Sequence, residues 1–289
     1  MTYVELKQRL VPLYGEQETQ AILRMILEIR FGLSHADILC GKVTHLSADD
    51  TEELEKIIQR LEKNEPVQYI LGQADFCGRT FHVNPNVLIP RPETEELCLW
   101  ITETVREQSS QPTILDIGTG SGCIAVTLAL ELPGSKVEAW DISRQAIEVA
   151  RQNAKQLGAP VIFVENDIQK VADSPINWKS LAEGKSKWDI IVSNPPYITT
   201  EERKDMEANV LAWEPHEALF VPNNNPLFFY ELIVRYAIRN MNDGGMVFFE
   251  INPLFEEQVV QTLAAHAFTD IIVREDIYGK RRFVRGTRT

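Results

Sequence analysis

The segment best suited to chemistry is Asn194-Pro195-Pro196-Tyr197, which directly follows the apolar run 188–193. Two successive prolines cannot continue a central β-strand, so the chain must leave the sheet there and expose the asparagine and the neighbouring carbonyl groups. An amide oxygen and a backbone carbonyl oxygen can together accept both hydrogens of a planar NH2 group. On its own, an Asn-Pro or Pro-Pro pair would indicate only a turn that ends a strand. We expect the segment to bind an NH2 group.

Such a site suits alkylation of an amide nitrogen, which is a weak nucleophile because its lone pair is delocalised into the carbonyl group. If the Asn194 side-chain oxygen and the Pro195 carbonyl accept the two hydrogens, the lone pair is aimed at the alkyl donor, and Tyr197 can stack on the amide plane. Positioning of this kind contributes about 7–11 kcal/mol in favourable cases, so a strong general base is not obligatory. Asn194, Pro195 and Tyr197 are therefore our candidate catalytic residues, and Pro196 completes the candidate substrate-binding segment.

A glycine-rich turn upstream indicates where the alkyl donor binds. The apolar segment 113–117 runs into Gly118-Thr119-Gly120-Ser121-Gly122 and then into an apolar helical pattern. Glycines at alternate positions let the backbone pass close to a ligand. Their spacing differs from the dinucleotide fingerprint, and the Gly-Lys-Ser/Thr of a phosphate-binding loop is missing. Asp116 would repel a pyrophosphate but suits the cationic methionine end of S-adenosylmethionine.

Two further predicted strands also end in carboxylates. The segment 136–141 ends at Asp141, where a carboxylate can accept two hydrogen bonds from a ribose diol, although an acid at a helix N-terminus is the simpler alternative. After the segment 161–165, Asp167 could accept from an adenine amino group while Ile168 packs on the ring. We expect these residues, with Asp116, Asn194 and the glycine turn, to form one S-adenosylmethionine-binding site.

This row of strand ends resembles a class I S-adenosylmethionine-dependent methyltransferase with an Asn-Pro-Pro-Tyr motif. A second stretch, which includes Ile89-Pro90-Arg91-Pro92-Glu93-Thr94-Glu95, closely resembles the HemK/PrmC family and is more specific than either motif alone. The similarity covers nearly the whole chain. It implies an enzyme that methylates the glutamine of the Gly-Gly-Gln loop in class I peptide chain release factors, with S-adenosylmethionine as cofactor. The related ribosomal-protein glutamine methyltransferase typically differs after Pro-Arg.

The elements that position these residues follow from the hydrophobic periodicity. Apolar residues recur at helical spacing within 22–29 and 54–61, so residues 1–70 are predicted to form a small helical bundle, which the resemblance implies recognises the substrate. Residues 71–90 are predicted to form a β-hairpin linker. Residues 91–289 alternate strand and helix patterns, which predicts an α/β, Rossmann-like catalytic domain with about seven mostly parallel strands and an antiparallel end.

Three details of this catalytic domain are also predicted. Residues 198–225 should form a lid or substrate-facing loop. Within them, Pro215-His216-Glu217 should be a surface turn. Arg91 and Glu93 should either form the mouth of the cofactor pocket or pair with each other.

Composition limits the partners. The net charge is −13, and the first 70 residues contain 12 acidic against 8 basic side chains, which favours a protein substrate over direct binding of DNA or RNA. No apolar run reaches transmembrane length and no signal-peptide pattern is present, so we expect a cytoplasmic protein, and a monomer. The histidines and cysteines show no metal-ligand spacing, so no metal is expected. All four cysteines are predicted to be buried apolar residues: Cys40, Cys77, Cys98 and Cys123.

Other functions use some of the same features. An amino-methyltransferase acting on adenine or guanine in DNA or RNA would share the Asn-Pro-Pro-Tyr chemistry and bind oligonucleotides with a steep salt dependence. A dinucleotide-dependent oxidoreductase is disfavoured by the glycine spacing and by Asp116. A non-catalytic binding module would bind the cofactor without turnover.

Overall fold

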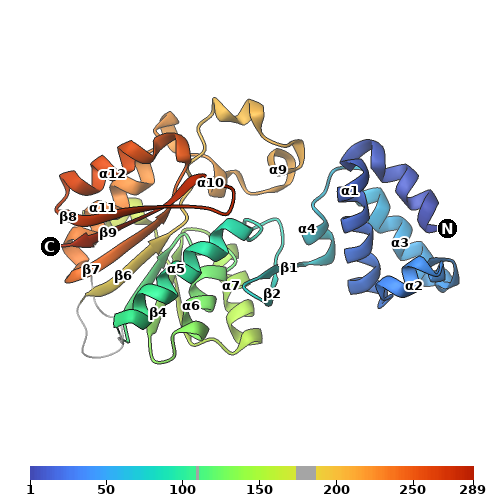
Figure 1. Ribbon diagram of the computed structural model, residues 1–289, viewed down its shortest axis with the longest axis horizontal. Coiled ribbons are helices and arrows are strands. Elements are labelled where there is room, and N and C mark those ends of the chain that lie inside the picture. Colours follow the sequence, from blue (N-terminus) through green and yellow to red (C-terminus); the bar gives the residue numbers. More distant parts are fainter. Residues whose placement is uncertain (109–110, 174–186) are drawn as a thin grey trace. The chain divides into compact units, whose positions relative to one another are not determined.

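The computed structural model describes residues 1–108, 111–173 and 187–289, which divide into two compact units (Figure 1). The first unit consists of Met1–Gln73 together with Met206–Trp213, and the second of Ala74–Asp205 together with Glu214–Thr289. The chain therefore leaves the second unit and returns to it within the segment 198–225.

The first unit is helical. Its first helix begins with a capping box between Thr2 and Glu5 and ends at Gly32, which adopts a left-handed φ of 65°. The helices within Met1–Gln73 bury a common set of apolar side chains that includes Leu10, Ile26 and Ile58. Its elements are α1 (Tyr3–Phe31), α2 (His35–Leu39), η1 (Lys42–His45), α3 (Ala48–Leu61), α4 (Val67–Leu71) and α9 (Ala208–Trp213).

The second unit is built on a seven-stranded sheet of order β5-β4-β3-β6-β7-β9-β8. The strands from β5 to β7 are parallel, whereas β9 is antiparallel to both of its neighbours. This confirms the predicted mostly parallel sheet with an antiparallel end. The strands are β3 (Thr113–Ile117), β4 (Lys136–Asp141), β5 (Val161–Glu165), β6 (Trp188–Ser193), β7 (Met241–Glu250), β8 (Phe268–Glu275) and β9 (Arg281–Arg288).

Helices cover both faces of this sheet (Figure 1). Along β3, Ile114 packs with the helices of one face and Leu115 with those of the other, so the strand is buried on both sides and reads as a continuous apolar run. One face carries α5 (Pro92–Gln108), α6 (Cys123–Glu131) and α7 (Arg144–Leu157); the other carries α8 (Ile168–Val171), α11 (Phe228–Asn240) and α12 (Glu256–Ala265).

Shorter elements complete the second unit. A two-stranded sheet of β1 (Gln73–Phe76) and β2 (Arg79–His82) precedes α5. Within 198–225, where the sequence predicts a loop, the structure has short helices, and Ile198 forms a β-bridge with Phe220. Apart from α9, which belongs to the first unit, these helices and the one after β7 are η2 (Glu202–Asp205), α10 (His216–Leu219), η3 (Pro222–Asn224) and η4 (Pro253–Phe255).

The cysteine prediction is right for two residues and wrong for two. Cys98 on α5 and Cys123 on α6 are buried. Cys40, however, is exposed because it caps the end of the short helix α2, and Cys77 is partly exposed in the turn between β1 and β2. Local sequence could not separate the two cases because all four lie beside apolar residues.

Candidate active site

A cavity of about 520 Å³ opens at the carboxyl ends of β3 to β6. This is the point where the chain order in the sheet reverses, since β3 leads outward to β4 while β6 leads the other way to β7. Ligands of open α/β sheets bind in that crevice. Its lining includes Gly118 and Gly120 after β3, Asp141 to Ser143 after β4, Asn166 to Gln169 after β5, Ser193 to Pro196 at the end of β6, and parts of 86–88 and 215–222.

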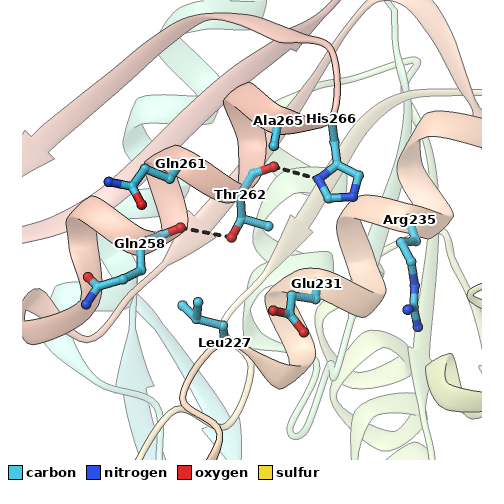
Figure 2. Close-up of a pocket in the computed structure, with 8 residues that line it drawn as sticks. All are labelled: Leu227, Glu231, Arg235, Gln258, Gln261, Thr262, Ala265 and His266. Atoms are coloured by element: carbon cyan, nitrogen blue, oxygen red, sulfur yellow. Dashed lines mark hydrogen bonds between the residues drawn. The ribbon is translucent and has the colours of Figure 1, made fainter.

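A second hollow, of about 410 Å³, lies between α11 and α12 (Figure 2). The two hydrogen bonds drawn there lie in α12 and its C-cap: Thr262 donates to the Gln258 carbonyl, and His266 Nδ1 contacts the Thr262 carbonyl. None of the predicted site residues lines it. We therefore place the candidate site in the larger cavity.

The glycine turn is held in a conformation that favours glycine. Gly118, Gly120 and Gly122 have φ angles of 77°, 54° and 81°. At the first two, no heavy atom lies within 4 Å of the position a Cβ would take, so the backbone is open to a ligand. At Gly122 a Cβ would lie 3.0 Å from that of Ala150 on α7. This glycine lets α6 pack on α7 and does not line the cavity.

Asp116 lies beneath this turn and is fully buried. Its Oδ2 accepts a hydrogen bond of 2.6 Å from Thr119 Oγ1, while Oδ1 has no partner of normal geometry among the described residues. The pKa of Asp116 is raised from 3.8 to about 7, chiefly by burial and partly by the nearby Asp141, against the opposing effect of the Thr119 hydrogen bond. The carboxyl therefore titrates near neutral pH.

Two carboxylates line the cavity. Asp141 accepts hydrogen bonds of 2.9 Å from the Gly120 and Ser143 amides, one on each oxygen, and burial raises its pKa. A carboxylate has about four lone-pair sites, so two remain for a ligand. Asp167 caps α8 through the Gln169 amide at 2.9 Å, and the buried Ile168 lies beside it in the lining.

The Asn-Pro-Pro-Tyr turn borders the same cavity. Asn194 Nδ2 donates to Thr94 Oγ1 at 3.2 Å, and Thr94 in turn donates to Glu250 Oε2 at 2.6 Å. The Tyr197 hydroxyl donates to Glu250 Oε1 at 3.4 Å, and burial raises the pKa of Tyr197. Asn194, Pro195 and Pro196 line the cavity, whereas Tyr197 packs behind them.

The structure thus brings together most of the predicted site residues. Around the cavity lie Gly118, Gly120, Asp141, Asp167, Ile168, Asn194, Pro195 and Pro196. Outside the lining lie Asp116, Thr119, Ser121, Gly122 and Tyr197. The sequence interpretation missed Thr94 and Glu250, although the sequence contained a hint of each. Thr94 falls within the specific motif 89–95. Glu250 is an acidic residue at the carboxyl end of an apolar strand, as Asp116 is near the end of its own strand.

The prediction of a surface turn at Pro215-His216-Glu217 is right in part: His216 and Glu217 are exposed, but they begin the short helix α10, and all three residues border the cavity. The preceding residue, Glu214, is buried and holds them there. Its Oε1 lies 2.5 Å from Arg91 Nη2, and its Oε2 accepts from the Ile89 amide at 3.4 Å. Arg91 therefore pairs with Glu214, and pairing with Glu93 is not the arrangement found.

Known proteins match both units of this chain. Its residues 5–72 match the PrmC N-terminal domain, and residues 99–219 match the methyltransferase small domain. The release factor glutamine methyltransferase of Bacteroides thetaiotaomicron is 45% identical over 283 residues, 98% of each chain. That of Flavobacterium psychrophilum is 39% identical over 280 residues, 96% of this chain and 95% of the other. The chain belongs to the release factor glutamine methyltransferase family.

This membership confirms the resemblance to the HemK/PrmC family. A solved 16S rRNA methyltransferase of T. thermophilus, in complex with AdoMet and guanosine, has a TM-score of 0.51 at 17% identity and covers 75% of this chain and 50% of its own. At that identity the likeness shows the fold alone, which is the class I methyltransferase fold. Among the residues described, no helix is long and apolar enough to cross a membrane, and no three His, Cys, Asp or Glu side chains are grouped to hold a metal.

Removal of the Glu214 charge should weaken the contacts that hold residues 215–222 against the cavity. Glu214→Gln leaves the Arg91 guanidinium with a weaker partner, and we expect a loss of about 1–3 kcal/mol in unfolding free energy, since Arg91 is only partly buried. Affinity for S-adenosylmethionine should also fall, because residues 215–222 lose their anchor. Urea unfolding and calorimetric titration measure the two effects.

Glu52→Gln is the matched control. It breaks an exposed pair with Lys56 on α3 and should change stability by less than about 0.5 kcal/mol. Equal effects of the two substitutions would contradict an anchoring role for Glu214.

Proposed function

We propose that this protein transfers a methyl group from S-adenosylmethionine to the side-chain amide nitrogen of the glutamine in the Gly-Gly-Gln motif of class I peptide chain release factors. The observation that carries the proposal is the Asn194 side chain, whose nitrogen is engaged by Thr94 while the residue borders the cavity. Its oxygen is left to accept a hydrogen from a substrate amide. Family membership supports the same reaction.

The cavity suits an adenosine-containing methyl donor. Because no side chain blocks the way at Gly118 and Gly120, the donor can lie close to the backbone of the glycine turn. The two remaining acceptor sites of Asp141 suit a ribose diol. Asp167 and Ile168 would hold the adenine. Asp116 lies beneath the turn and outside the lining, so it would favour a cationic methionine end through its charge when ionised, while Thr119, Ser121 and Gly122 keep the turn in place. When bound, the donor supplies a methyl carbon made electrophilic by its sulfonium group.

The turn would then orient the nucleophile. The Asn194 oxygen and the Pro195 carbonyl accept the two hydrogens of the substrate amide, and Pro196 and Tyr197 hold the shape of the turn around it. The nitrogen lone pair forms the new N–C bond as the C–S bond breaks, and one amide proton is then released to solvent. Because orientation supplies much of the rate enhancement, no strong base is needed.

The helical bundle of residues 1–70 would recognise the release factor, with residues 71–90 as linker and residues 91–289 as the catalytic domain. The excess of acidic side chains in that bundle supports a protein partner over direct nucleic-acid binding. Since release factors act in translation, we expect the enzyme to work in the cytoplasm, and as a monomer.

Methyl transfer from labelled S-adenosylmethionine to a purified class I release factor tests this function. We expect label on the release factor and none on a version whose Gly-Gly-Gln glutamine is replaced by alanine. Label on ribosomal protein or on nucleic acid, with none on the release factor, would keep the fold and overturn the substrate. Cofactor binding without transfer to any of these would indicate a binding module.

A further inference from the structure

A buried carboxylate, Glu250, stands behind the Asn-Pro-Pro-Tyr turn and is linked to both of its ends: directly to Tyr197, and through Thr94 to Asn194. We propose that Glu250, acting through Thr94, sets the orientation of the Asn194 side-chain amide and, through Tyr197, anchors the far end of the turn. Thr94 and Glu250 are thus positioning residues for the methyl transfer. The inference rests on the proposed function and assigns a task to two residues outside the turn and the cofactor site.

The sheet places Glu250 beside the turn. Strands β6 and β7 are parallel, with Ser193 opposite Phe249, so Asn194 and Glu250 are the next residues on neighbouring strands. Glu250 is 2% exposed, and its backbone carbonyl accepts a hydrogen bond of 3.1 Å from the Tyr230 hydroxyl on α11. Thr94, on the first turn of α5, is 3% exposed and lies between the two. The three positions are therefore fixed by the packed sheet and its helices.

The hydrogen-bond chain has one allowed direction while Glu250 is ionised. A carboxylate only accepts, so the single hydroxyl proton of Thr94 must go to Glu250 Oε2, at 2.6 Å. The Thr94 oxygen can then only accept from Asn194, and the Asn194 amide has its donors on Nδ2 alone. The nitrogen therefore faces Thr94 at 3.2 Å, and the oxygen is turned away from it. A reversed amide would bring two acceptors together and offer NH2 to the NH2 of a substrate.

Tyr197 provides the second attachment. Its hydroxyl donates to Oε1 of the same carboxylate at 3.4 Å, so the first and last residues of the turn are tied to one group. Two prolines separate them and restrict the backbone between the two attachments. The carboxylate thus limits both the side chain of Asn194 and the shape of the turn.

The environment of Glu250 favours a functional explanation for its burial. No cation lies within salt-bridge distance of it in the part of the chain that the structure describes, and the guanidinium of Arg282 is paired with Asp276 at 2.8 Å. Burial raises the pKa of Glu250 against the lowering effects of the Thr94 hydrogen bond and of the more distant Arg282 charge, which means that its charged form is costly to bury. A buried carboxylate with a raised pKa and no direct salt bridge is a candidate for a functional role.

Four variants test the proposal in the full-length enzyme with release factor as substrate. Thr94→Val keeps the shape but removes the hydroxyl, and we expect kcat to fall about 10–100-fold, as for a misplaced reacting group, with KM and the cofactor dissociation constant within about threefold of wild type. Thr94→Ser should restore most of the rate. Glu250→Gln should also lower kcat, since a Gln oxygen and a Gln nitrogen cannot both accept. In an Asn194→Ala background, Thr94→Val should have no further effect.

Thr102→Val is the matched control. Thr102 lies on the same helix, is 4% exposed, and donates only to the Cys98 carbonyl of its own helix at 2.8 Å. The control should lose little rate. Equal kcat values for Thr94→Val and Thr102→Val would overturn the proposal, as would a Thr94→Val defect confined to KM or cofactor binding.

Hydrogen exchange of the Asn194 side-chain amide can be measured without methyl transfer, so it tests the orientation of this side chain independently of the proposed function. In a protein labelled with ¹⁵N-asparagine, the side-chain NH2 signals of Asn194 are those lost in Asn194→Ala. We expect one of its two protons to exchange slowly in wild type and both to exchange fast in Thr94→Val or, should that variant not fold, in Glu250→Gln. Slow exchange in a wild type that does not methylate release factor would keep the positioning and overturn the substrate. Fast exchange in wild type would overturn the positioning itself.

Discussion

Asn194→Ala should lower the rate of methyl transfer to the release factor by about 10²–10³-fold, the loss seen when a preorganised hydrogen-bonding group is removed. The dissociation constant for S-adenosylmethionine should change by less than about threefold, because most of the cavity lining lies elsewhere. The physical reason is that the alanine cannot accept a hydrogen from the substrate amide, so the nitrogen lone pair is no longer aimed. Initial rates and calorimetric titration of the cofactor measure the two quantities.

Asn242→Ala serves as its control. Asn242 is on β7 but donates to Asp189 at the start of β6, near the opposite end of the strands from the cavity. It should leave kcat unchanged even where it costs stability. A near-normal rate for Asn194→Ala would remove the turn from the mechanism and leave only the strand-ending role of its prolines.

The second large effect concerns the pH dependence of stability. The pKa of Asp116 is raised by burial from 3.8 to about 7, so between these values the folded chain keeps a proton that the unfolded chain has released. Stability from this group therefore falls as the pH rises through that window, by up to about 1.4 kcal/mol per pH unit, and levels off above it. Asp116→Asn cannot titrate. Its stability relative to wild type should rise by a few kcal/mol, on the order of the full shift, over the same window.

Urea unfolding of the two proteins between about pH 5 and 8 measures this difference. Every other titrating group is shared, so the difference between the two curves isolates Asp116. The asparagine also places an NH2 group where Oδ1 has no partner, which adds an offset that does not vary with pH. Parallel curves would show that Asp116 is ionised throughout in the folded protein.

The row of strand ends could be predicted from sequence because an apolar strand pattern and the turn that follows it are both visible in a short stretch of chain. The run 113–117 followed by alternate glycines indicates a buried strand that turns close to a ligand, and parallel strands bring their carboxyl ends to one edge. Asp141 and Asn194 could therefore be placed at one cavity without knowledge of the sheet order. Periodicity likewise predicts the helical bundle, whose apolar residues recur within single helices.

What the sequence could not give depends on contacts between distant segments. Thr94 and Glu250 are 156 residues apart, and neither position alone indicates that they share a hydrogen bond. Pro215, His216 and Glu217 look like a surface turn because a proline is followed by two polar residues. They line the cavity because Glu214 is held by Arg91, 123 residues earlier. Pairing between side chains so far apart in sequence produces no periodic pattern from which it could be predicted.

The sheet order also determines when the site can form during synthesis. Strand β9 is the last of the seven in the chain, yet it lies between β7 and β8. Until residues 281–288 leave the ribosome, β7, which carries Glu250, has an open edge, and β8 lacks the neighbour that joins it to the sheet. Unpaired edges invite pairing with other chains. A nascent chain arrested before Arg281 should therefore depend on chaperones, and the turn should reach its final geometry only after the strands around it have been completed.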